Sequence, residues 1–441
     1  MHKSLSRLLT FTLAAALLVQ PALAAGQAAA PEGWTSPFSD VAEKDWYYPY
    51  VATLNSQGVI DGYPDGRFGA KDPVSAGAAL VMVLKGAGLG TMTPQEGTHW
   101  ASAYSNFAVA RGWLTEEDTA QLDGAIPRLR IVQLAAQALG LSPSKDPSPF
   151  ADADDGYATV LYQQGLLAGN QEGDQLLLKP RDSITRAEIS AIVWQVQRYA
   201  SQIRIAGKTV PVLAAIPANS YDLSAFQSED GRMTYTADGV NTALGIDVSS
   251  HQGTIDWDKV ADDGIQFAMI RSGGRYYGSG VIFEDTQFQN NIKGAIKAGL
   301  DVGVYFFSQA VTVEEAQEEA QFVLNLIEEY DLTGPVVFDW ENISDNSART
   351  NGVDRATLTA MANAFCETVE KAGYPPMIYL NQYLGYLRYD LEGVIQYPFW
   401  LAQYNAYPGF RYDFQMWQYT DAGQVDGIDS RVDLNLWLLP Q

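Results

Sequence analysis

Short apolar runs alternate with amphipathic stretches in the second half of this 441-residue chain. Five runs rich in β-branched and aromatic residues are separated by helical patterns such as VEEAQEEAQFVLNLIEEY and RATLTAMANAFCETVEKAG. The runs cover residues 243–250, 267–274, 301–309, 335–341 and 376–382. This alternation predicts βαβ units and a parallel sheet that is buried on both faces.

The rhythm changes after residue 382. Three more strand-like runs, at 399–404, 414–420 and 432–438, follow one another across gaps too short for a full crossover helix. Eight strands with helices after only the first five predict an incomplete α/β TIM-like barrel, (β/α)5(β)3, over residues 243–441. In such barrels the functional side chains come from strand ends at the C-terminal mouth.

Polar and aromatic side chains stand at the predicted strand ends. They are Asp247, Arg271, Ser308, Asp339 with Glu341, Asn381, Gln403 with Tyr404, and Gln418 with Tyr419. Asp339 and Glu341 are two residues apart, so in a strand they share a face while Trp340 points the opposite way. Such a pair is compatible with catalysis, a metal site or a solvated strand terminus. Carboxylates set among aromatic rings, which pack against sugar C–H surfaces, favour a carbohydrate site.

The first half of the chain repeats itself three times, at 38–89, 98–141 and 150–200. Each unit has an aromatic-bearing helical pattern, a glycine-containing turn, a polar loop and a second amphipathic helix. Stacked repeats bury one another's faces and can present a shared groove. The pattern dissolves over 204–242, where scattered Pro, Ser and Gly predict a short strand pair near 204–214 followed by a linker.

Charge and histidine content exclude several function classes. The net charge of −24 argues against nucleic acid and anionic membranes as partners, but not against neutral glycans. Only three histidines occur, so a His-rich zinc site is not expected, and neither is any other metal or cofactor. The single cysteine, Cys366, lies in a helical pattern and fits a small buried apolar role.

Residues 1–24 have the features of a secretory signal peptide. Lys3 and Arg7 precede an apolar run, and Ala22-Leu23-Ala24 forms an A-x-A cleavage pattern. No later apolar stretch reaches membrane length, so we expect a secreted chain without membrane insertion after signal cleavage.

The three repeats resemble S-layer homology domains, which hold proteins on bacterial cell walls. The resemblance rests on F-x-D-V/A openings in the first and third repeats, on Gly-Tyr-Pro-Asp-Gly at 62–66 and on Ile-Thr-Arg-Ala-Glu at 184–188. In that family the Thr-Arg-Ala-Glu segment helps to bind secondary cell-wall polysaccharide. The resemblance therefore implies a protein bound to the bacterial cell wall through Arg186, and through Arg128 in the degenerate second repeat. A surface salt bridge is the alternative role for Arg186.

Residues 244–438 resemble glycoside hydrolase family 25, a family of lysozymes. The matching segments keep their order and spacing across the whole domain, and include Gly245-Ile246-Asp247-Val248-Ser249, Ile270-Arg271, Gly303-Val304-Tyr305, Phe338-Asp339-Trp340-Glu341, Trp400-Leu401-Ala402-Gln403-Tyr404, Trp417-Gln418-Tyr419 and Val432-Asp433-Leu434-Asn435. The resemblance implies cleavage of the β-1,4 bond between N-acetylmuramic acid and N-acetylglucosamine in peptidoglycan glycan strands. Family members often have a histidine where this chain has Phe306, a difference that bears on substrate preference.

Four acids match catalytic positions of that family. Glu341 matches the general acid, and Asp339, Asp247 and Asp433 match the other acids. Asp433 lies near the start of its strand, so it reaches the mouth only if that strand runs opposite to its neighbours or its loop bends back. Asp339 could stabilise positive charge or orient a 2-acetamido group as internal nucleophile. Retaining and inverting mechanisms both stay open.

Eight further residues are expected to contact the substrate: Arg271, Tyr305, Tyr379, Asn381, Gln403, Tyr404, Trp417 and Gln418. Arg271 could instead form an ion pair with Asp247 or Asp339, and the aromatic members could be ordinary core. Two alternative functions come from other classes. One is a non-catalytic wall-binding or structural protein, and the other is a chitinase-like glycosidase.

Overall fold

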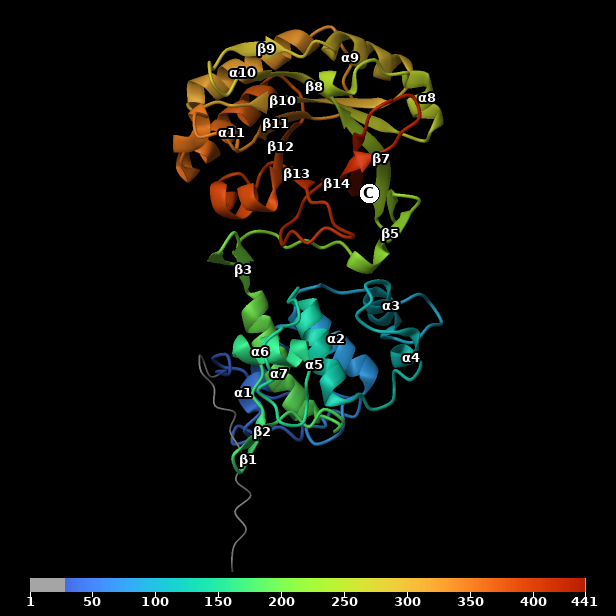
Figure 1. The fold of residues 1–441 in the computed structure, drawn as a ribbon, viewed down its shortest axis with the longest axis vertical. Coiled ribbons are helices and arrows are strands. Elements are labelled where there is room, and N and C mark those ends of the chain that lie inside the picture. Colours follow the sequence, from blue (N-terminus) through green and yellow to red (C-terminus); the bar gives the residue numbers. More distant parts are fainter. Residues whose placement is uncertain (1–27, 441) are drawn as a thin grey trace, which may run out of the picture. The chain divides into compact units, whose positions relative to one another are not determined.

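The computed structural model describes residues 28–440, so the expected signal peptide lies outside the described residues. The chain forms two compact units (Figure 1). The first contains the chain up to Gly88 together with Gly97–Ala200, and the second contains Leu89–Glu96 and the chain from Ser201 onward. Among the described residues, no helix is long and apolar enough to span a membrane.

The first unit is built mainly from helices. Its elements are α1 (Tyr48–Ser56), α2 (Ala76–Gly86), α3 (Ser102–Ala110), α4 (Glu116–Thr119), α5 (Arg128–Ala138), α6 (Gly156–Gln163), β1 (Asn170–Glu172), β2 (Gln175–Leu177) and α7 (Arg186–Ala200). The segments that enter α2, α5 and α7 pair with one another through three bridges, Pro73 with Thr185, Ser75 with Ala125, and Pro127 with Ser183. Each of the three repeats therefore pairs with both of the others.

The F-x-D openings of the repeats have a structural role. Asp40 accepts hydrogen bonds from the backbone N–H groups of Phe68 and Gly69, at 2.7 and 2.9 Å. Asp152 does the same for Leu178 and Lys179, at 2.7 and 2.8 Å. In the first and third repeats this acid thus fixes the turn that leads to the second helix.

The second unit contains a closed eight-stranded barrel. Its strands are β7 (Val240–Val248), β8 (Phe267–Arg275), β10 (Asp301–Ser308), β11 (Val336–Trp340), β12 (Pro376–Asn381), β13 (Phe399–Ala402), β14 (Met416–Gly423) and β15 (Val432–Pro440). The sheet is closed by pairing of β10 with β8. Neighbouring strands are parallel except β15, which is antiparallel to both β14 and β7. The predicted barrel is confirmed.

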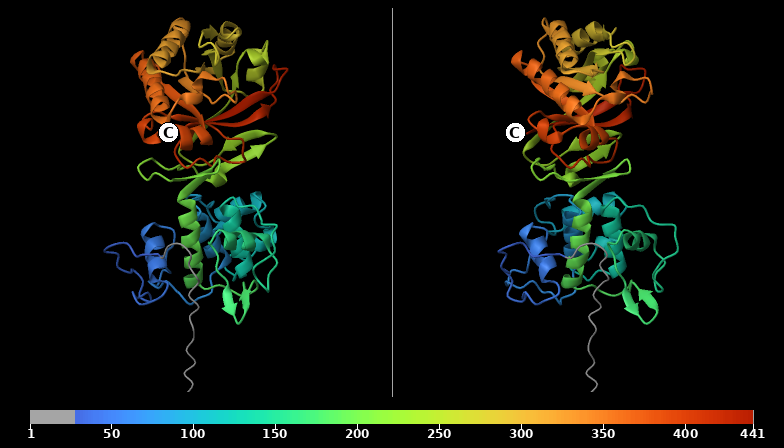
Figure 2. Two further views of the ribbon diagram at one scale, coloured as in Figure 1. Left: turned by 60° about the vertical axis from the view of Figure 1, so that its left-hand side comes forward. Right: turned by 90° about the vertical axis from the view of Figure 1, so that its left-hand side faces the viewer.

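Helices cover only part of the barrel. The helices α8 (Trp257–Asp262), α9 (Phe288–Lys297), α10 (Val313–Ile327) and α11 (Arg355–Lys371) lie outside the strands, as the yellow-green to orange coiled ribbons in Figure 2 show. After β12 the chain forms one turn of π-helix, Leu384–Arg388, instead of the expected fifth α-helix. Glycine has low helix propensity, and a Cβ at Gly385 would lie only 2.9 Å from the Phe410 ring, so this segment stays short and tightly packed.

The barrel interior is filled by apolar side chains. The buried cluster consists of Phe267, Met269, Val337, Met377, Tyr379, Trp400 and Met416. Successive residues of a strand alternate between its two faces, so Asp339 points to the same side of β11 as the core residue Val337. The interior side of β11 therefore changes from apolar to acidic toward the C-terminal mouth.

The segment 204–242 is more ordered than its composition indicates. The expected strand pair is present as β3 (Gln202–Ile205) and β4 (Lys208–Pro211). The expected linker beyond it is wrong, because β5 (Phe226–Glu229) and β6 (Arg232–Tyr235) form a second hairpin. The Phe226 ring packs on Trp417 with ring centroids 5.4 Å apart. The hairpin therefore covers part of β14, which has no helix of its own outside it.

Candidate active site

The four predicted acids are brought to one mouth of the barrel. Asp247 near the end of β7 lies directly opposite Asp433 on β15 in the strand register. Because β15 is antiparallel, Asp433 near its start reaches the same end of the barrel as the ends of the parallel strands. Asp339 is the second-to-last residue of β11, and Glu341 directly follows that strand. The condition stated for Asp433 from the sequence is therefore met.

Asp247 is a buried carboxylate that is held by two amides. Its Oδ2 accepts hydrogen bonds from Gln418 Nε2 and Asn435 Nδ2, both at 2.8 Å. Burial raises the pKa of Asp247 to about 6, although the amide donors act in the opposite direction. Hydrogen bonds to the charged form stabilise it, so Asp247 can be ionised near neutral pH despite its burial.

Asp433 shares its electrostatic environment with Asp247. Burial, and next the negative charge of Asp247, raise the pKa of Asp433 to about 8. Two carboxyl groups that face each other in a desolvated site do not both ionise readily, and their titrations belong to the pair. The pair therefore retains a proton to higher pH than two separate carboxyl groups would.

Asp339 and Glu341 are both shifted toward the protonated form. Asp339 is only 5% exposed, and its Oδ1 has no hydrogen-bond partner among the described residues. Burial raises the pKa of Asp339 well above its ordinary value, and the charges of Glu341 and Asp247 add to the effect. Burial and the charge of Asp247 also raise the pKa of Glu341, which remains partly exposed. The mouth therefore contains a carboxyl group that can keep its proton at higher pH than a free acid.

The backbone that carries Glu341 is fixed by the neighbouring strand. The side chain of Gln309 donates to the carbonyl oxygen of Glu341 at 3.0 Å. The indole Nε1 of Trp340 donates to the carbonyl oxygen of Ala310 at 3.1 Å. These bonds hold the C-terminal end of β11 against the segment after β10, and so fix the backbone position from which the Glu341 side chain extends.

Gln418 connects the acids to two tyrosines. Its Oε1 accepts hydrogen bonds from Tyr379 Oη at 2.9 Å and from Tyr404 Oη at 3.0 Å. Tyr404 is 50% exposed. The Tyr305 ring packs on Trp400 of the interior cluster, with ring centroids 5.9 Å apart. Burial, and then the charge of Asp247, raise the pKa of Tyr305. Tyr379, Tyr404 and Gln418 are therefore linked to Asp247 by hydrogen bonds, and the substrate contacts expected of them and of Tyr305 stay a prediction.

Trp417 is a correction to the sequence interpretation. Its side chain is fully buried, and its Nε1 donates to the carbonyl oxygen of Gln403 at 2.8 Å. Neighbouring residues of a strand face opposite sides, and Gln418 points inward, so Trp417 points outward against the β5–β6 hairpin. Trp417 belongs to the core and does not reach the mouth.

Three other predicted contacts are already used within the protein. Asn381 accepts a hydrogen bond from the backbone of Leu384 at 3.0 Å, and Gln403 accepts one from Gly409 at 2.8 Å. Both side chains fix loops. Arg271 forms an ion pair, but with buried Asp285 at 2.6 Å rather than with Asp247 or Asp339.

The sequence interpretation missed one member of the site. Asn435 is fully buried, donates to Asp247, and accepts a hydrogen bond from Trp400 Nε1 at 2.8 Å. Its position two residues after Asp433 places it on the same face of β15, which is the signal that could have identified it.

Among the residues the structure describes, no group of three or more His, Cys, Asp or Glu side chains is arranged to hold a metal ion.

Arg186 in the first unit is also a correction. Its side chain is buried, with Nε donating to the carbonyl oxygen of Phe68 at 2.7 Å and Nη2 to that of Asp61 at 2.6 Å. The guanidinium lies 4.8 Å from the ring centroids of both Tyr63 and Phe68. Arg186 therefore holds the first repeat to the third, and it forms neither a surface salt bridge nor an open binding group. Arg128 is paired with Glu188 at 3.3 Å.

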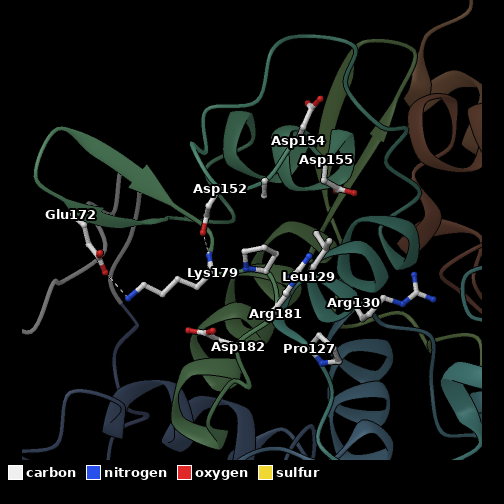
Figure 3. Close-up of a pocket in the computed structure, with 12 residues that line it drawn as sticks. Pro127, Leu129, Arg130, Asp152, Asp154, Asp155, Glu172, Lys179, Arg181 and Asp182 are labelled. Atoms are coloured by element: carbon white, nitrogen blue, oxygen red, sulfur yellow. Dashed lines mark hydrogen bonds and ion pairs between the residues drawn. The ribbon is translucent and has the colours of Figure 1, made fainter.

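A pocket of about 840 Å³ lies in the same unit (Figure 3). Its lining comes from the second and third repeats, and consists of Pro127, Leu129, Arg130, Asp152, Ala153, Asp154, Asp155, Glu172, Lys179, Pro180, Arg181 and Asp182. Lys179 reaches Glu172 at 2.6 Å, and Arg130 is paired with Asp118. Arg181 is exposed and makes no ion pair with any described residue. Cations and acids thus alternate around this pocket.

Family models match one segment in each of the two units of the chain. The family model described as glycosyl hydrolases family 25 matches residues 246–428, and that of the S-layer homology domain matches residues 37–79. The chain is 33% identical over 208 residues to the uncharacterized protein YegX of Escherichia coli (strain K12), a match that covers 44% of this chain and 70% of YegX. It is 25% identical over 193 residues to the autolytic lysozyme of Clostridium acetobutylicum, covering 43% of this chain and 54% of that protein.

A similar solved structure is that of the modular autolysin LytC from Streptococcus pneumoniae in complex with a synthetic peptidoglycan ligand. It is 24% identical, with a TM-score of 0.42, over 54% of this chain and 56% of the LytC chain. The match to LytC thus spans just over half of that chain. On the family models and the match to YegX, the chain belongs to the glycosyl hydrolases of family 25, and is a glycoside hydrolase that also carries an S-layer homology domain.

Proposed function

We propose that the protein is a wall-anchored lysozyme that hydrolyses the β-1,4 bond between N-acetylmuramic acid and N-acetylglucosamine in peptidoglycan. The observation that carries the proposal is the cluster of four acids at the barrel mouth, in which burial and neighbouring charge raise the pKa of Glu341. Relatives of this chain are named lysozymes. A glycosidase needs a carboxylic acid that is still protonated when it meets the glycosidic oxygen.

Glu341 is proposed as the general acid. Of the Asp339 and Glu341 pair, it is the more exposed, so a leaving-group oxygen can reach it. The ionised Asp247 contributes to its raised pKa, which keeps the proton on Glu341 until it is transferred. The hydrogen bond from Gln309 to the Glu341 carbonyl holds the acid in place without involving its carboxyl group.

Asp339 is proposed to orient a group of the bound substrate through a hydrogen bond. Its Oδ1 is buried and has no partner among the described residues, and a buried polar atom of that kind is costly unless something bonds to it. Both acids leave the same strand, whereas acids acting on opposite sugar faces stand across from each other. We therefore assign to Asp339 the orientation of a 2-acetamido group that attacks the sugar carbon as an internal nucleophile. An undiminished rate on a substrate without the acetamido carbonyl would refute this role.

The wall-binding part is proposed to use the pocket of Figure 3. The buried Arg186 is fully engaged, so a secondary cell-wall polysaccharide needs other cations, and Arg181, Lys179 and Arg130 line the pocket between the second and third repeats. The protein would then be secreted and held on the bacterial wall while its barrel cuts the glycan strands. Replacing Arg181 by glutamate should lower the fraction of protein that co-sediments with purified walls. The rate of cleavage of soluble glycan strands should be unchanged.

Clearing of a purified-wall suspension tests the enzymatic proposal. We expect the wild type and Glu328→Gln, a change at the exposed C-terminal end of α10, to clear the suspension at equal rates. Glu341→Gln should clear it at least about a hundredfold more slowly, because the general acid is lost. Equal clearing by Glu341→Gln would refute the assignment. If the wild type releases no sugar from the walls, the result favours a non-catalytic wall-binding protein instead.

A further inference from the structure

Two neighbouring tyrosines are exposed on a hairpin next to the acids. The strand β9 (Ile282–Glu284) folds back antiparallel onto the end of β8, with residues 276–281 as the connection. Tyr276 is 53% exposed and Tyr277 is 42% exposed. Most large aromatic side chains of the described barrel are buried, so two adjacent open rings need an explanation.

Extending the strand register past its last paired residues brings Tyr276 level with Glu341. Phe307 on β10 pairs with Asp339 on β11 and with Gly274 on β8. Glu341 lies two residues beyond Asp339, and Tyr276 lies two residues beyond Gly274. The two residues therefore stand at the same height on the strands that flank β10. Adjacent strands are about 4.8 Å apart, so their backbones are separated by roughly 10 Å.

Arg275 fixes the direction in which Tyr276 points. The guanidinium of Arg275 is buried on the outer side of the barrel, where Nε donates to Glu319 of α10 at 2.7 Å. Tyr276 directly follows β8, and its backbone N–H continues the hairpin pairing by donating to the carbonyl oxygen of Val281 at 3.0 Å. By alternation its side chain therefore lies on the opposite side from Arg275, toward the mouth. One face of its ring packs on Phe283, with centroids 4.5 Å apart and planes inclined by 32°. The rest of the ring is open.

Hydrogen bonds hold the hairpin tip and connect it to the backbone of the general acid. Arg275 Nη1 donates to the carbonyl oxygen of Gly280 at 2.7 Å. The backbone N–H of Arg349 donates to the carbonyl oxygen of Tyr277 at 3.1 Å, and Arg349 Nη1 donates to that of Gln309 at 3.0 Å. Gln309 is the residue that bonds to the Glu341 backbone. Little ordering entropy remains to be lost when a ligand packs on this tip.

We propose that Tyr276 forms an additional sugar-binding subsite, which packs against a residue of the glycan strand beyond the bond that is cut. The inference rests on the proposed function, because the occupant is the continuation of the same strand. A flat, open aromatic face suits the C–H surface of a sugar ring, and its position level with Glu341 is within reach of a sugar further along the bound chain. The subsite would make cleavage depend on strand length.

Kinetics on glycan strands of defined length test the proposal. For the wild type, kcat/KM should increase from short oligomers to long strands, and Tyr276→Ala should reduce that gain about five- to tenfold. Tyr276→Phe and Tyr276→Trp keep a ring and should keep the gain. Tyr162→Ala removes a tyrosine of similar exposure, 42%, from α6 of the other unit and should change nothing.

The outcomes separate this inference from the proposed function. A length-dependent gain that survives in Tyr276→Ala, or that is lost equally in Tyr276→Phe, contradicts the subsite while leaving the enzymatic assignment intact. Absence of cleavage by the wild type at every length contradicts the proposed function itself. A gain that depends on the aromatic ring at position 276 supports both.

Discussion

Replacing Asn435 by leucine should move the acidic limb of the pH–rate profile to higher pH. Asn435 is one of the two amide donors to Asp247, whose pKa is about 6 in the folded protein. Ionised Asp247 raises the pKa of Glu341, so protonation of Asp247 removes part of the charge that keeps the general acid protonated and organised. In the wild type we therefore expect the rate to fall as the pH falls through about 6.

The size of the shift follows from the lost hydrogen bond. A hydrogen bond to a charged group contributes about 1.5–3 kcal/mol, and one pKa unit corresponds to about 1.4 kcal/mol. Loss of the Asn435 donor favours the protonated form of Asp247. The apparent pKa of the acidic limb should therefore rise by about one to two units. Gln418 still donates to the same oxygen, which keeps the shift from being larger.

The assay is the pH dependence of kcat/KM on soluble glycan strands. Asn363→Leu is the control, because it also removes an asparagine that forms several hydrogen bonds, and these lie away from the acids. The Asn363 side chain donates to Thr359 and Gly393 and accepts from Gln396. Both variants should be less stable, and only Asn435→Leu should shift the limb. A limb that stays in place in Asn435→Leu, or moves to lower pH, refutes the role given to Asp247.

Three further predictions concern stability. Trp417→Ala should lower the free energy of unfolding of the barrel by about 3–5 kcal/mol, measured by urea denaturation, with the loss in stability rather than in KM because Trp417 is core. Arg186→Ala should destabilise the repeat unit by roughly 3 kcal/mol in the same measurement, because two backbone carbonyls lose a charged donor. The pKa of Asp433 is raised to about 8 in the folded state, so its stabilising contribution is complete below pH about 4 and is lost as the pH rises through about 8. Urea unfolding at pH 5 and pH 9 should show this loss, and Asp433→Asn should reduce it.

The barrel and its acids could be predicted because they follow from local patterns. Alternating strand and helix segments predict the sheet, and residues at strand ends meet at one mouth. The position of Asp433 depended on the direction of one strand, which the sequence left open and the structure shows to be antiparallel. Asn435 could have been recognised as a neighbour of Asp433 from alternation alone.

The errors have a common physical cause, which is that partners distant in sequence decide burial. Trp417 stands at a strand end, but the β5–β6 hairpin covers it, and that hairpin was hidden in a stretch of mixed composition. Arg186 sits in a binding motif, yet its guanidinium is used by backbone carbonyls more than a hundred residues earlier in the chain. Neither contact leaves a signature in the neighbouring residues.

The most direct test of the central assignment is the identity of the reducing ends released from purified peptidoglycan. We predict that the wild type releases fragments whose new reducing ends are N-acetylmuramic acid, and that Glu341→Gln releases essentially none. New ends of N-acetylglucosamine would point to a chitinase-like specificity. Equal release of muramic-acid ends by Glu341→Gln would contradict the role of Glu341 as the proton donor.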